Sequence, residues 1–431
     1  MLGKVTDNDV DENRSINRML INEILSWTNI SLAIERVRAN KGAPGVDGMT
    51  VDELEAHFRR NWKSITDHIK HGTYIPSPVK RVDIPKPDGG TRMLGIPTVQ
   101  DRTIQQAINQ VLMPIFDPTF SEYSYGFRPN RSALDAVRKA SEYIAEGKSW
   151  VVEIDLAKFF DTVNHDRLMS TLARRIDDKA LLKLIRRYLK AGIMADGLVS
   201  AREEGVPQGG NLSPLLSLIV LDELDKNLEK RGIAFCRYAD DCNLFVSSKM
   251  AGERVLEKTT KFIEEKLKLR VNQSKSGTFR PSKCKYLGYT FVGTTGQPRA
   301  HAKSLKRLRQ KLYPILRTYG RGMSMEITIK RLTQILRGWM NYYSLDNRKG
   351  IYRALDIWIR RHLRKLLWIS WKQPKTRESK LLERGLGSYR AWKSSVNGRG
   401  AWWNAKALHM LHAYPIAWFA EQGLYSLEKR G

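Results

Sequence analysis

The chain has 431 residues, 42% of them hydrophobic, and a formal net charge of +29. This length has room for about three domains. The apolar content is ample for packed cores, so the chain is a globular protein and not a disordered tail. The longest purely apolar stretches, such as residues 218–221, are far too short to cross a bilayer, and the acidic, polar stretch 1–14 is not a secretion signal. We therefore expect a soluble intracellular protein.

Positive charge is concentrated in the last third of the chain. Residues 299–375 hold 20 Lys and Arg against 3 Asp and Glu, and residues 376–431 hold 9 against 4. The net charge of these 133 residues is therefore +22, which leaves +7 for the first 298. Aromatic residues are interleaved with the cations. This pattern is typical of nucleic-acid binding, although an anionic membrane surface would also attract it.

Only three cysteines occur, Cys236, Cys242 and Cys284, and none belongs to a CxxC pair. Their number and spacing exclude a disulfide framework and a zinc finger built on cysteines. We expect all three to be small buried side chains.

The first hundred residues predict helices followed by a hairpin. Residues 15–70 have helical patterns on both sides of a Gly-rich loop at 41–48. Within 79–97, two short strand-like runs flank Pro87-Asp-Gly-Gly90, which is typical of a β-hairpin. The cations of this hairpin suit the soluble edge of a sheet.

The middle of the chain predicts a strand and a well-marked helix. Trp150-Val-Val-Glu-Ile154 is a β-prone run that ends at Asp155. The Gly-rich loop 205–212 precedes a helix for which Ser213 is the expected N-cap and Pro214 the first helical residue.

Further along, a helix is expected over 254–268, with short strands at 269–272 and 286–291. After about residue 299 the pattern is helical, with basic residues opposite Leu, Ile and Trp. Since strands give way to helices there, we expect a domain boundary near residue 298.

Residues 233–246 place two adjacent carboxylates, Asp240 and Asp241, between two apolar runs. We expect two strands joined by a tight turn, in which Asp is favoured, so a purely structural role is open. Two carboxylates about 4 Å apart repel each other by roughly 1 kcal/mol in water and by more in a drier site. Asp155 is a third carboxylate at a strand end. Two Mg²⁺ ions between the three would offset the repulsion and could hold the attacking and leaving oxygens of a phosphoryl transfer.

The sequence resembles bacterial group II intron-encoded reverse transcriptases, also called maturases. The likeness rests on stretches that occur in the family's order between about residues 20 and 375: KGAPGVDGMT, IPKPDGGTRMLGIPTVQDRTIQQAI, YGFRPNRSALDAV, VPQGGNLSPLLS, RYADD, VNQSKS, KYLGYTF and LRGWMNYY. One such stretch would be a weak sign, whereas all of them in order are a specific one.

This resemblance implies a metal site. Asp155, Asp240 and Asp241 would hold two Mg²⁺ ions, for which Mn²⁺ is a possible substitute, and the main-chain carbonyl of Leu156 would be a further ligand.

It also implies contacts with the substrates. Lys86 and Arg92 would reach the triphosphate of the incoming dNTP. Phe159 matches the aromatic residue that lies under the deoxyribose and excludes a 2′-hydroxyl, with a core role as the alternative. Gln208 and Lys275 match positions near the nucleotide, although either could be a solvent-facing loop residue.

For the primer, Tyr238 would support the reacting end, with strand packing as the alternative. The resemblance implies a thumb that grips the template–primer duplex and also binds structured intron RNA. On the sequence, its expected cations are Lys303, Lys306, Arg307, Arg309 and Lys311.

The implied fold class is α+β: a right-hand polymerase whose fingers and palm contain an antiparallel sheet, followed by an all-helical thumb and a small C-terminal segment. The expected parts are an N-terminal extension with the Gly-rich loop (1–75), fingers and palm (76–298), the thumb or maturase domain (299–375) and a DNA-binding segment (376–431). The chain has no cysteine after Cys284 and stops at Gly431, so we expect no endonuclease of its own.

The leading hypothesis is an RNA-directed DNA polymerase that adds dNTPs to a 3′-hydroxyl on an RNA template and assists the splicing and retrohoming of its intron. Its expected partners are intron RNA, RNA template, DNA primer or target, and dNTPs, with no membrane, in the bacterial cytoplasm at the nucleoid. The alternatives are an RNA-binding splicing factor that retains a palm, or a related reverse transcriptase recruited to phage defence or CRISPR adaptation. The sequence leaves the oligomeric state open.

Overall fold

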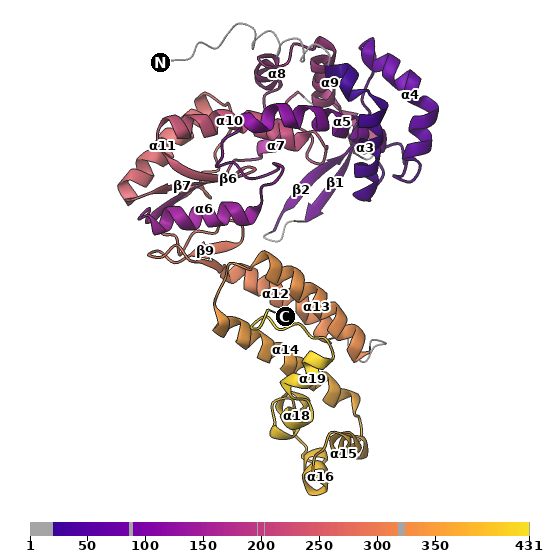
Figure 1. Ribbon diagram of the computed structural model, residues 1–431, viewed down its shortest axis with the longest axis vertical. Coiled ribbons are helices and arrows are strands. Elements are labelled where there is room, and N and C mark those ends of the chain that lie inside the picture. The colour runs from indigo at the N-terminus through magenta and orange to yellow at the C-terminus, as the bar shows by residue number, and fades with distance from the viewer. Residues whose placement is uncertain (1–19, 86–88, 196, 202, 318–323, 431) are drawn as a thin grey trace. The chain divides into compact units, whose positions relative to one another are not determined.

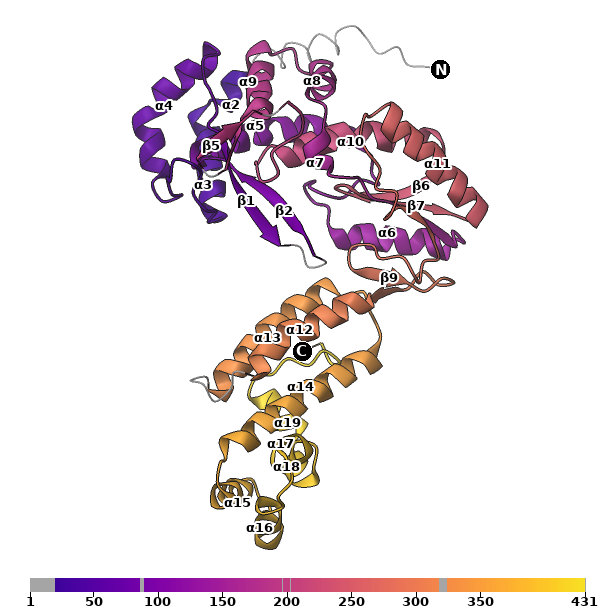
Figure 2. The ribbon, with the colours of Figure 1, turned by 180° about the vertical axis from the view of Figure 1, so that it is seen from behind.

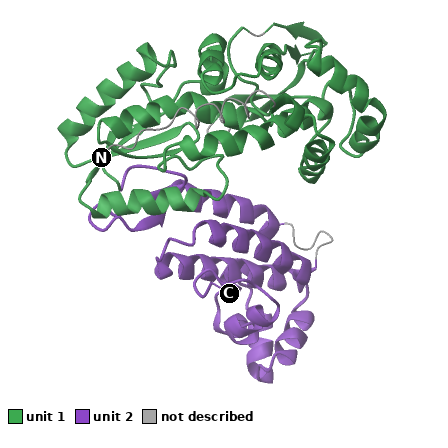
Figure 3. Cartoon of the chain, turned by 45° about the horizontal axis from the view of Figure 1, so that its top comes forward, with its two compact units in different colours: residues 1–281 green, residues 282–431 purple. Residues whose placement is uncertain are grey.

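The computed structural model describes residues 20–85, 89–195, 197–201, 203–317 and 324–430. Lys86 lies outside the described residues. The chain forms two compact units, Met1–Pro281 and Ser282–Gly431, each with its own hydrophobic core (Figure 3).

Helices α2 (Leu20–Ile24), α3 (Trp27–Ala39) and α4 (Leu54–Lys70) pack against α5 (Val99–Phe116) in the first unit (Figure 1). The side chain of Ser26 caps α3 by accepting a hydrogen bond from the N–H of Asn29 at 3.3 Å. The Asn29 amide donates to the carbonyl of Ala107 in α5 at 3.1 Å, which joins the two helices. Within the described residues, the helices predicted on both sides of the Gly-rich loop are confirmed.

The predicted hairpin is also confirmed. Strand β1 (Val79–Pro85) pairs antiparallel with β2 (Thr91–Ile96). The same strand runs parallel to β4 (Ile193–Ala195), which pairs with β5 (Leu198–Ser200), so the sheet has the order β2-β1-β4-β5. Most side chains of β1 are exposed, and only Val79 is buried.

A second sheet, antiparallel throughout, has the order β6-β7-β3-β8. Its strands are β3 (Trp150–Ile154), β6 (Ala234–Tyr238), β7 (Asp241–Val246) and β8 (Gly277–Phe279). On one face, Phe245 packs against Tyr143 of helix α6 (Ala133–Ala145). On the other, Val152 lies under Gly252 of helix α11 (Lys249–Glu265). Figures 1 and 2 show these two helices on opposite faces, so this part of the unit has three layers. The predicted α+β class is confirmed.

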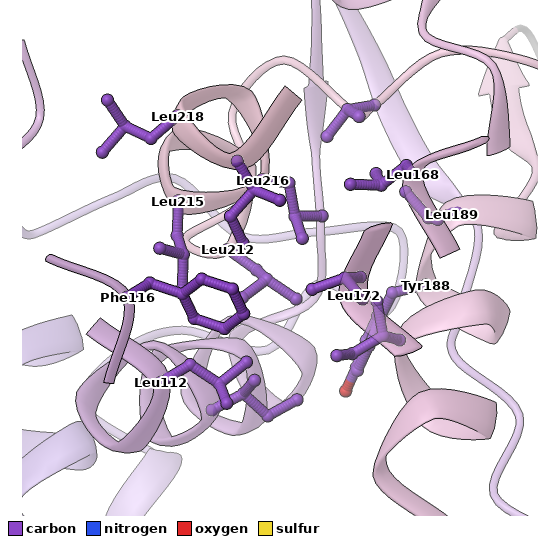
Figure 4. Packing of buried hydrophobic residues seen from close by; sticks show 14 of the residues in the cluster. Leu112, Phe116, Leu168, Leu172, Tyr188, Leu189, Leu212, Leu215, Leu216 and Leu218 are labelled. Atoms are coloured by element: carbon purple, nitrogen blue, oxygen red, sulfur yellow. The ribbon is translucent and has the colours of Figure 1, made fainter. Parts of the chain in front are cut away.

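Leucines from four helices form the core beside this sheet (Figure 4). They come from α5, α8 (His165–Ala173), α9 (Lys179–Lys190) and α10 (Ser213–Lys230). Leu112, Leu172 and Leu215, for example, have no exposed surface, and burying each contributes roughly 1.5–3 kcal/mol. The short helix α7 (Phe159–Thr162) and the 3₁₀ helix η1 (Asp117–Thr119) complete the first unit.

The start of α10 corrects one prediction. The N-cap is Leu212, not Ser213, and Ser213 is already the first helical residue. The hydroxyl of Ser213 donates a hydrogen bond to the carbonyl of Pro207 at 2.6 Å, so it holds the preceding loop and does not cap the helix. Pro214 lies in the first turn, as predicted.

Two further boundaries differ from the predicted ones. Helix α11 begins at Lys249, earlier than expected, because the side chain of Ser248 caps it by accepting from the N–H of Ala251 at 3.2 Å. The strand expected at 269–272 is reduced to a single bridge between Val271 and Leu156.

The second unit contains a short hairpin and helices. Its hairpin consists of β9 (Tyr289–Phe291), shorter than the expected strand, and β10 (Pro298–Ala300). The helices are α12 (Ala302–Arg317), α13 (Met325–Tyr342), α14 (Lys349–Ser370), α15 (Pro374–Glu383), α16 (Ser388–Ser395), α17 (Ala401–Asn404), α18 (Leu408–Ala413) and α19 (Ile416–Glu421).

The hairpin is bound to these helices. The N–H of Ala300 donates to the buried carboxylate of Asp346 at 2.8 Å, and the hydroxyl of Tyr289 donates to the carbonyl of Tyr342. For this reason the compact units part at Pro281, upstream of the boundary expected near residue 298.

All three cysteines are buried, as predicted, and none of them forms a disulfide. Burial raises the pKa of the Cys236 and Cys242 thiols, so both stay protonated. Across the described ranges, no helix combines the length and the apolar character that a membrane span requires.

Two histidines make the second unit sensitive to acid. Burial lowers the pKa of His362 in α14 and of His409 in α18 to about 4, and nearby cations add to the effect. One ring nitrogen of each is buried without a hydrogen-bond partner in the described structure. An unfolded histidine titrates near pH 6.5, so between about 6.5 and 4 the unfolded chain binds more protons than the folded one.

We therefore expect the free energy of unfolding to fall as the pH drops from about 6.5 to 4, by roughly 1–3 kcal/mol for each histidine. Urea unfolding followed by circular dichroism at several pH values measures it. A variant with His362→Gln and His409→Gln should be less sensitive over this range, and an unchanged pH dependence would contradict the assignment.

Candidate active site

The turn between β6 and β7 and the strand residues beside it include three of the predicted site residues, Tyr238, Asp240 and Asp241. Tyr238 pairs with Asp241, so only Ala239 and Asp240 lie between the strands, and the expected tight turn is confirmed. Ala239 has a φ of 57°, in the left-handed region where a residue with a side chain is uncommon. This backbone needs support from its surroundings, because such conformations are strained.

The buried side chain of Arg237 supplies that support from inside. Its Nε donates to Oδ1 of Asp225 in α10 at 2.7 Å, and Nη2 donates to the second oxygen of the same carboxylate. Nη1 donates to the carbonyl of Ala239 at 2.9 Å, and Nη2 also donates to the hydroxyl of Ser124 at 2.8 Å. Burial alone would lower the pKa of Arg237, but the ion pair with Asp225 outweighs it and the pKa is raised. The guanidinium therefore ties the turn to a core helix.

Residues 121–128 support the same turn from outside. The N–H of Tyr125 donates to the carbonyl of Arg237 at 2.8 Å. At Gly126, an added Cβ would lie 2.3 Å from the main-chain nitrogen of Ala239. Only glycine permits this approach, so the stretch YGF places its backbone directly against the turn.

Asp155 lies at the same end of the sheet as the turn. Strands β3 and β7 are antiparallel with Ile154 opposite Cys242, so the next residue of the chain, Asp155, comes level with Asp241. The Asp155 backbone is fixed, since its N–H donates to the hydroxyl of Ser276 at 3.0 Å and its carbonyl accepts from the N–H of Asn272 at 2.8 Å.

A cation lies beside this carboxylate. The Nζ of Lys275 is 3.8 Å from Oδ2 of Asp155, and both side chains are solvent-accessible. The residue that the sequence placed near an incoming nucleotide therefore stands next to a predicted metal ligand. Leu156, whose carbonyl is the further expected ligand, is opposite Val271 in an isolated bridge.

The residue types at this edge suit a divalent cation, because carboxylate oxygens are the ligands that Mg²⁺ prefers. Strand register brings Asp155, Asp240 and Asp241 to one edge. In the part of the chain that the structure describes, no three His, Cys, Asp or Glu side chains are grouped closely enough to hold a metal ion. Metal binding by these residues therefore stays a prediction, one that requires their side chains to turn toward a common point.

The Gly-rich loop 205–212 joins α7 to the first sheet. The N–H of Val206 donates to the carbonyl of Phe160 at 2.6 Å. An added Cβ at Gly209 would lie 2.6 Å from the carbonyl oxygen of Gly95 in β2, so only glycine fits there. Gln208 accepts a hydrogen bond from the N–H of Gly95 at 2.9 Å through its main chain, and its side chain is half-buried.

Phe159, expected to lie under the sugar, is 3% exposed and belongs to the hydrophobic core. Its burial favours the core role that the sequence left open. The next residue, Phe160, is only partly buried and lies on the same short helix. Arg92 is exposed on β2, and Tyr238 is half-buried at the end of β6.

The five predicted thumb cations all belong to the second unit. They lie on α12 and are exposed: Lys303, Lys306, Arg307, Arg309 and Lys311.

Sequence reasoning missed the parts that hold the turn. A charged residue within the apolar run Ile233-Ala-Phe-Cys-Arg237 is a signal for a buried ion pair, because an unpaired buried charge is too costly. Its partner Asp225 could not be found from the sequence, since α10 holds four acidic residues and nothing in their pattern singles out one of them.

Two known families match different parts of the chain. The family described as "Reverse transcriptase (RNA-dependent DNA polymerase)" matches residues 84–291, which include all three aspartates. The family described as "Group II intron, maturase-specific domain" matches residues 305–385, in the helical unit.

Individual relatives extend these matches. Protein YkfC of Escherichia coli K12 is 37% identical over 278 residues, which cover 55% of this chain and 73% of that protein. The group II intron-encoded protein LtrA of Lactococcus lactis subsp. cremoris is 38% identical over 196 residues, 45% of this chain and 32% of LtrA, so the match spans about a third of that relative. A chain of a solved Cas6-RT-Cas1–Cas2 complex is 24% identical, with a TM-score of 0.38, over 57% of this chain and 42% of that one.

The ion pair under the turn leads to a prediction about stability. Asp225→Asn keeps the shape of the side chain but leaves the charge of Arg237 uncompensated in the interior, which typically costs about 3–5 kcal/mol. We expect a loss of this size in urea unfolding. The control Glu142→Gln removes an exposed ion pair with Lys139 and should change stability by less than about 1 kcal/mol. Equal effects of the two substitutions would contradict the role of Arg237.

Proposed function

Because the chain belongs to the family of group II intron reverse transcriptases and maturases, and is therefore an RNA-directed DNA polymerase, we propose that it extends a 3′-hydroxyl by two-metal catalysis at Asp155, Asp240 and Asp241. The observation that carries this proposal is the strand register, which brings three carboxylates from two distant segments to one edge of a sheet. Two bound Mg²⁺ ions would activate the 3′-hydroxyl and neutralise charge on the leaving pyrophosphate.

Three further residues are proposed to bind the nucleotide, and one of them, Lys275, lies at this edge. Arg92 is exposed on β2 and Gln208 lies on the loop that packs on that strand, while Lys275 stands at Asp155. Cations so placed can bind phosphate oxygens through charge-assisted hydrogen bonds. Lys86, which lies outside the described residues, is proposed for the same role on sequence grounds.

Selection against ribonucleotides is assigned to the aromatic pair at 159–160. The rings of Phe159 and Phe160 are in edge contact, with centroids 5.1 Å apart. Since Phe159 is in the core, we propose that Phe160 faces the sugar and that Phe159 holds it in position.

The helical unit is proposed to bind RNA. Residues 299–375 carry 20 Lys and Arg against 3 Asp and Glu, and the cations of α12 are exposed. A duplex of RNA would be held through its phosphates and 2′-hydroxyls, and engaging about six phosphates would give a log–log salt slope of about −5. Through this binding the protein would assist the splicing and retrohoming of a host intron, at the bacterial nucleoid.

Asp240→Ala tests the metal site. We expect primer extension on an RNA template to fall by about a thousandfold, since a lost metal contact removes several kcal/mol from transition-state stabilisation. RNA binding, measured by filter retention, should stay within about twofold. A variant that still extends a DNA primer at the wild-type rate would disprove the assignment.

Phe160→Ala tests sugar selection. We expect incorporation of ribonucleotides relative to deoxyribonucleotides to rise about tenfold, the size expected when one apolar contact in a pocket is lost. Phe159→Ala should instead lower stability by about 3–5 kcal/mol, because it opens a cavity in the core. If Phe160→Ala leaves discrimination unchanged in single-nucleotide incorporation assays, another residue excludes the 2′-hydroxyl.

A further inference from the structure

A groove of about 670 Å³ lies within the helical unit, between α12 and α13. One wall is a single face of α12, formed by Ser304, Arg307, Leu308 and Lys311. The other wall is α13, and the turn at residues 285–288 lines the groove as well. This volume lies in the range of sites that take one small organic ligand.

The α13 side of the groove is aromatic. The rings of Trp339 and Tyr343 are stacked, with centroids 4.4 Å apart at 30°, and Tyr342 meets Tyr343 edge-on at 5.0 Å. Ile335 and Leu308 extend this surface with aliphatic side chains. Such a wall suits the face of a flat heterocycle, because every nucleobase can stack on an aromatic ring.

Three cations line the same groove. Arg307 and Lys311 are one helical turn apart on α12, and Lys285 comes from the adjoining turn. No acidic side chain is among the described residues that line it. An anionic group bound beside the aromatic wall would therefore meet only favourable charge.

Gly338 opens the middle of the groove. It lies inside α13, where glycine costs roughly 0.5–1 kcal/mol relative to alanine. A Cβ added there would meet no atom within 4 Å, so packing within the protein does not require glycine. Because Gly338 also lines the groove, the helix backbone is open to a bound ligand there.

We propose that this groove binds one unpaired nucleotide of a structured RNA, with the base against Trp339 and Tyr343 and the phosphate at Arg307 and Lys311. Paired bases are stacked within their helix and cannot enter, so the groove distinguishes bulged or looped RNA from duplex. The inference rests on the proposed RNA binding by this unit and adds which form of RNA it selects. Lys303, Lys306 and Arg309 do not line the groove and remain for phosphates of the duplex.

The test compares two RNA hairpins that differ only by one unpaired adenosine, using the full chain without metal. We expect the wild type to bind the bulged hairpin about tenfold more tightly, the scale of one stacked base. Gly338→Leu, which fills the groove with a good helix former, should abolish this preference and leave the affinity for the paired hairpin unchanged. The matched control is Gly350→Leu in α14, where an added side chain also meets open space and the preference should persist.

The outcomes separate the two proposals. No preference for the bulged hairpin in the wild type, or a preference that survives in Gly338→Leu, would overturn the groove assignment while RNA binding itself stands. Weak, salt-independent binding of both hairpins would refute RNA binding by the unit. If Gly338→Leu also loses affinity for the paired hairpin, the same two hairpins are compared with Gly338→Ala, which adds only one methyl group. Loss of the preference for the bulged hairpin in that variant supports the groove, and an unchanged preference contradicts it.

Discussion

The buried ion pair between Arg237 and Asp225 is the contact on which the site depends. Both side chains are essentially inaccessible to water, so each charge is tolerable only because the other is present. The guanidinium also binds the carbonyl of Ala239, whose backbone lies in an unfavourable region. Through one side chain, the core helix α10 therefore fixes the conformation of a turn that must carry two acidic residues into solvent.

Sequence patterns could predict that the three aspartates lie at one end of a sheet, because each of them adjoins a strand. The runs 150–154 and 233–246 are rich in β-branched and aromatic residues, as buried strands are, and the three aspartates lie at strand ends. Antiparallel register then places those ends together without any knowledge of side-chain packing. The hairpin at 79–96 was predictable for a similar reason, since its turn residues are distinctive.

Other features depend on contacts between distant segments, which a single sequence does not reveal. Ser213 has the residue type of an N-cap, yet its hydroxyl is bound to Pro207, and Leu212 takes the cap position. Gly126 lies in a stretch typical of the family. Glycine is needed there because the backbone closely approaches Ala239, and only the three-dimensional structure shows this contact. The full burial of Phe159 and the partial burial of Phe160 likewise follow from packing, because both residues have the same side chain.

The burial of all three cysteines has a practical consequence for physical study. All three thiols are buried, and those of Cys236 and Cys242 stay protonated, so the folded chain should react slowly with maleimides. A cysteine introduced at an exposed position of either compact unit would then be the fast-reacting one. Fluorophore or spin-label pairs could be attached to the native background, and distances between the units followed during RNA engagement without first removing natural thiols.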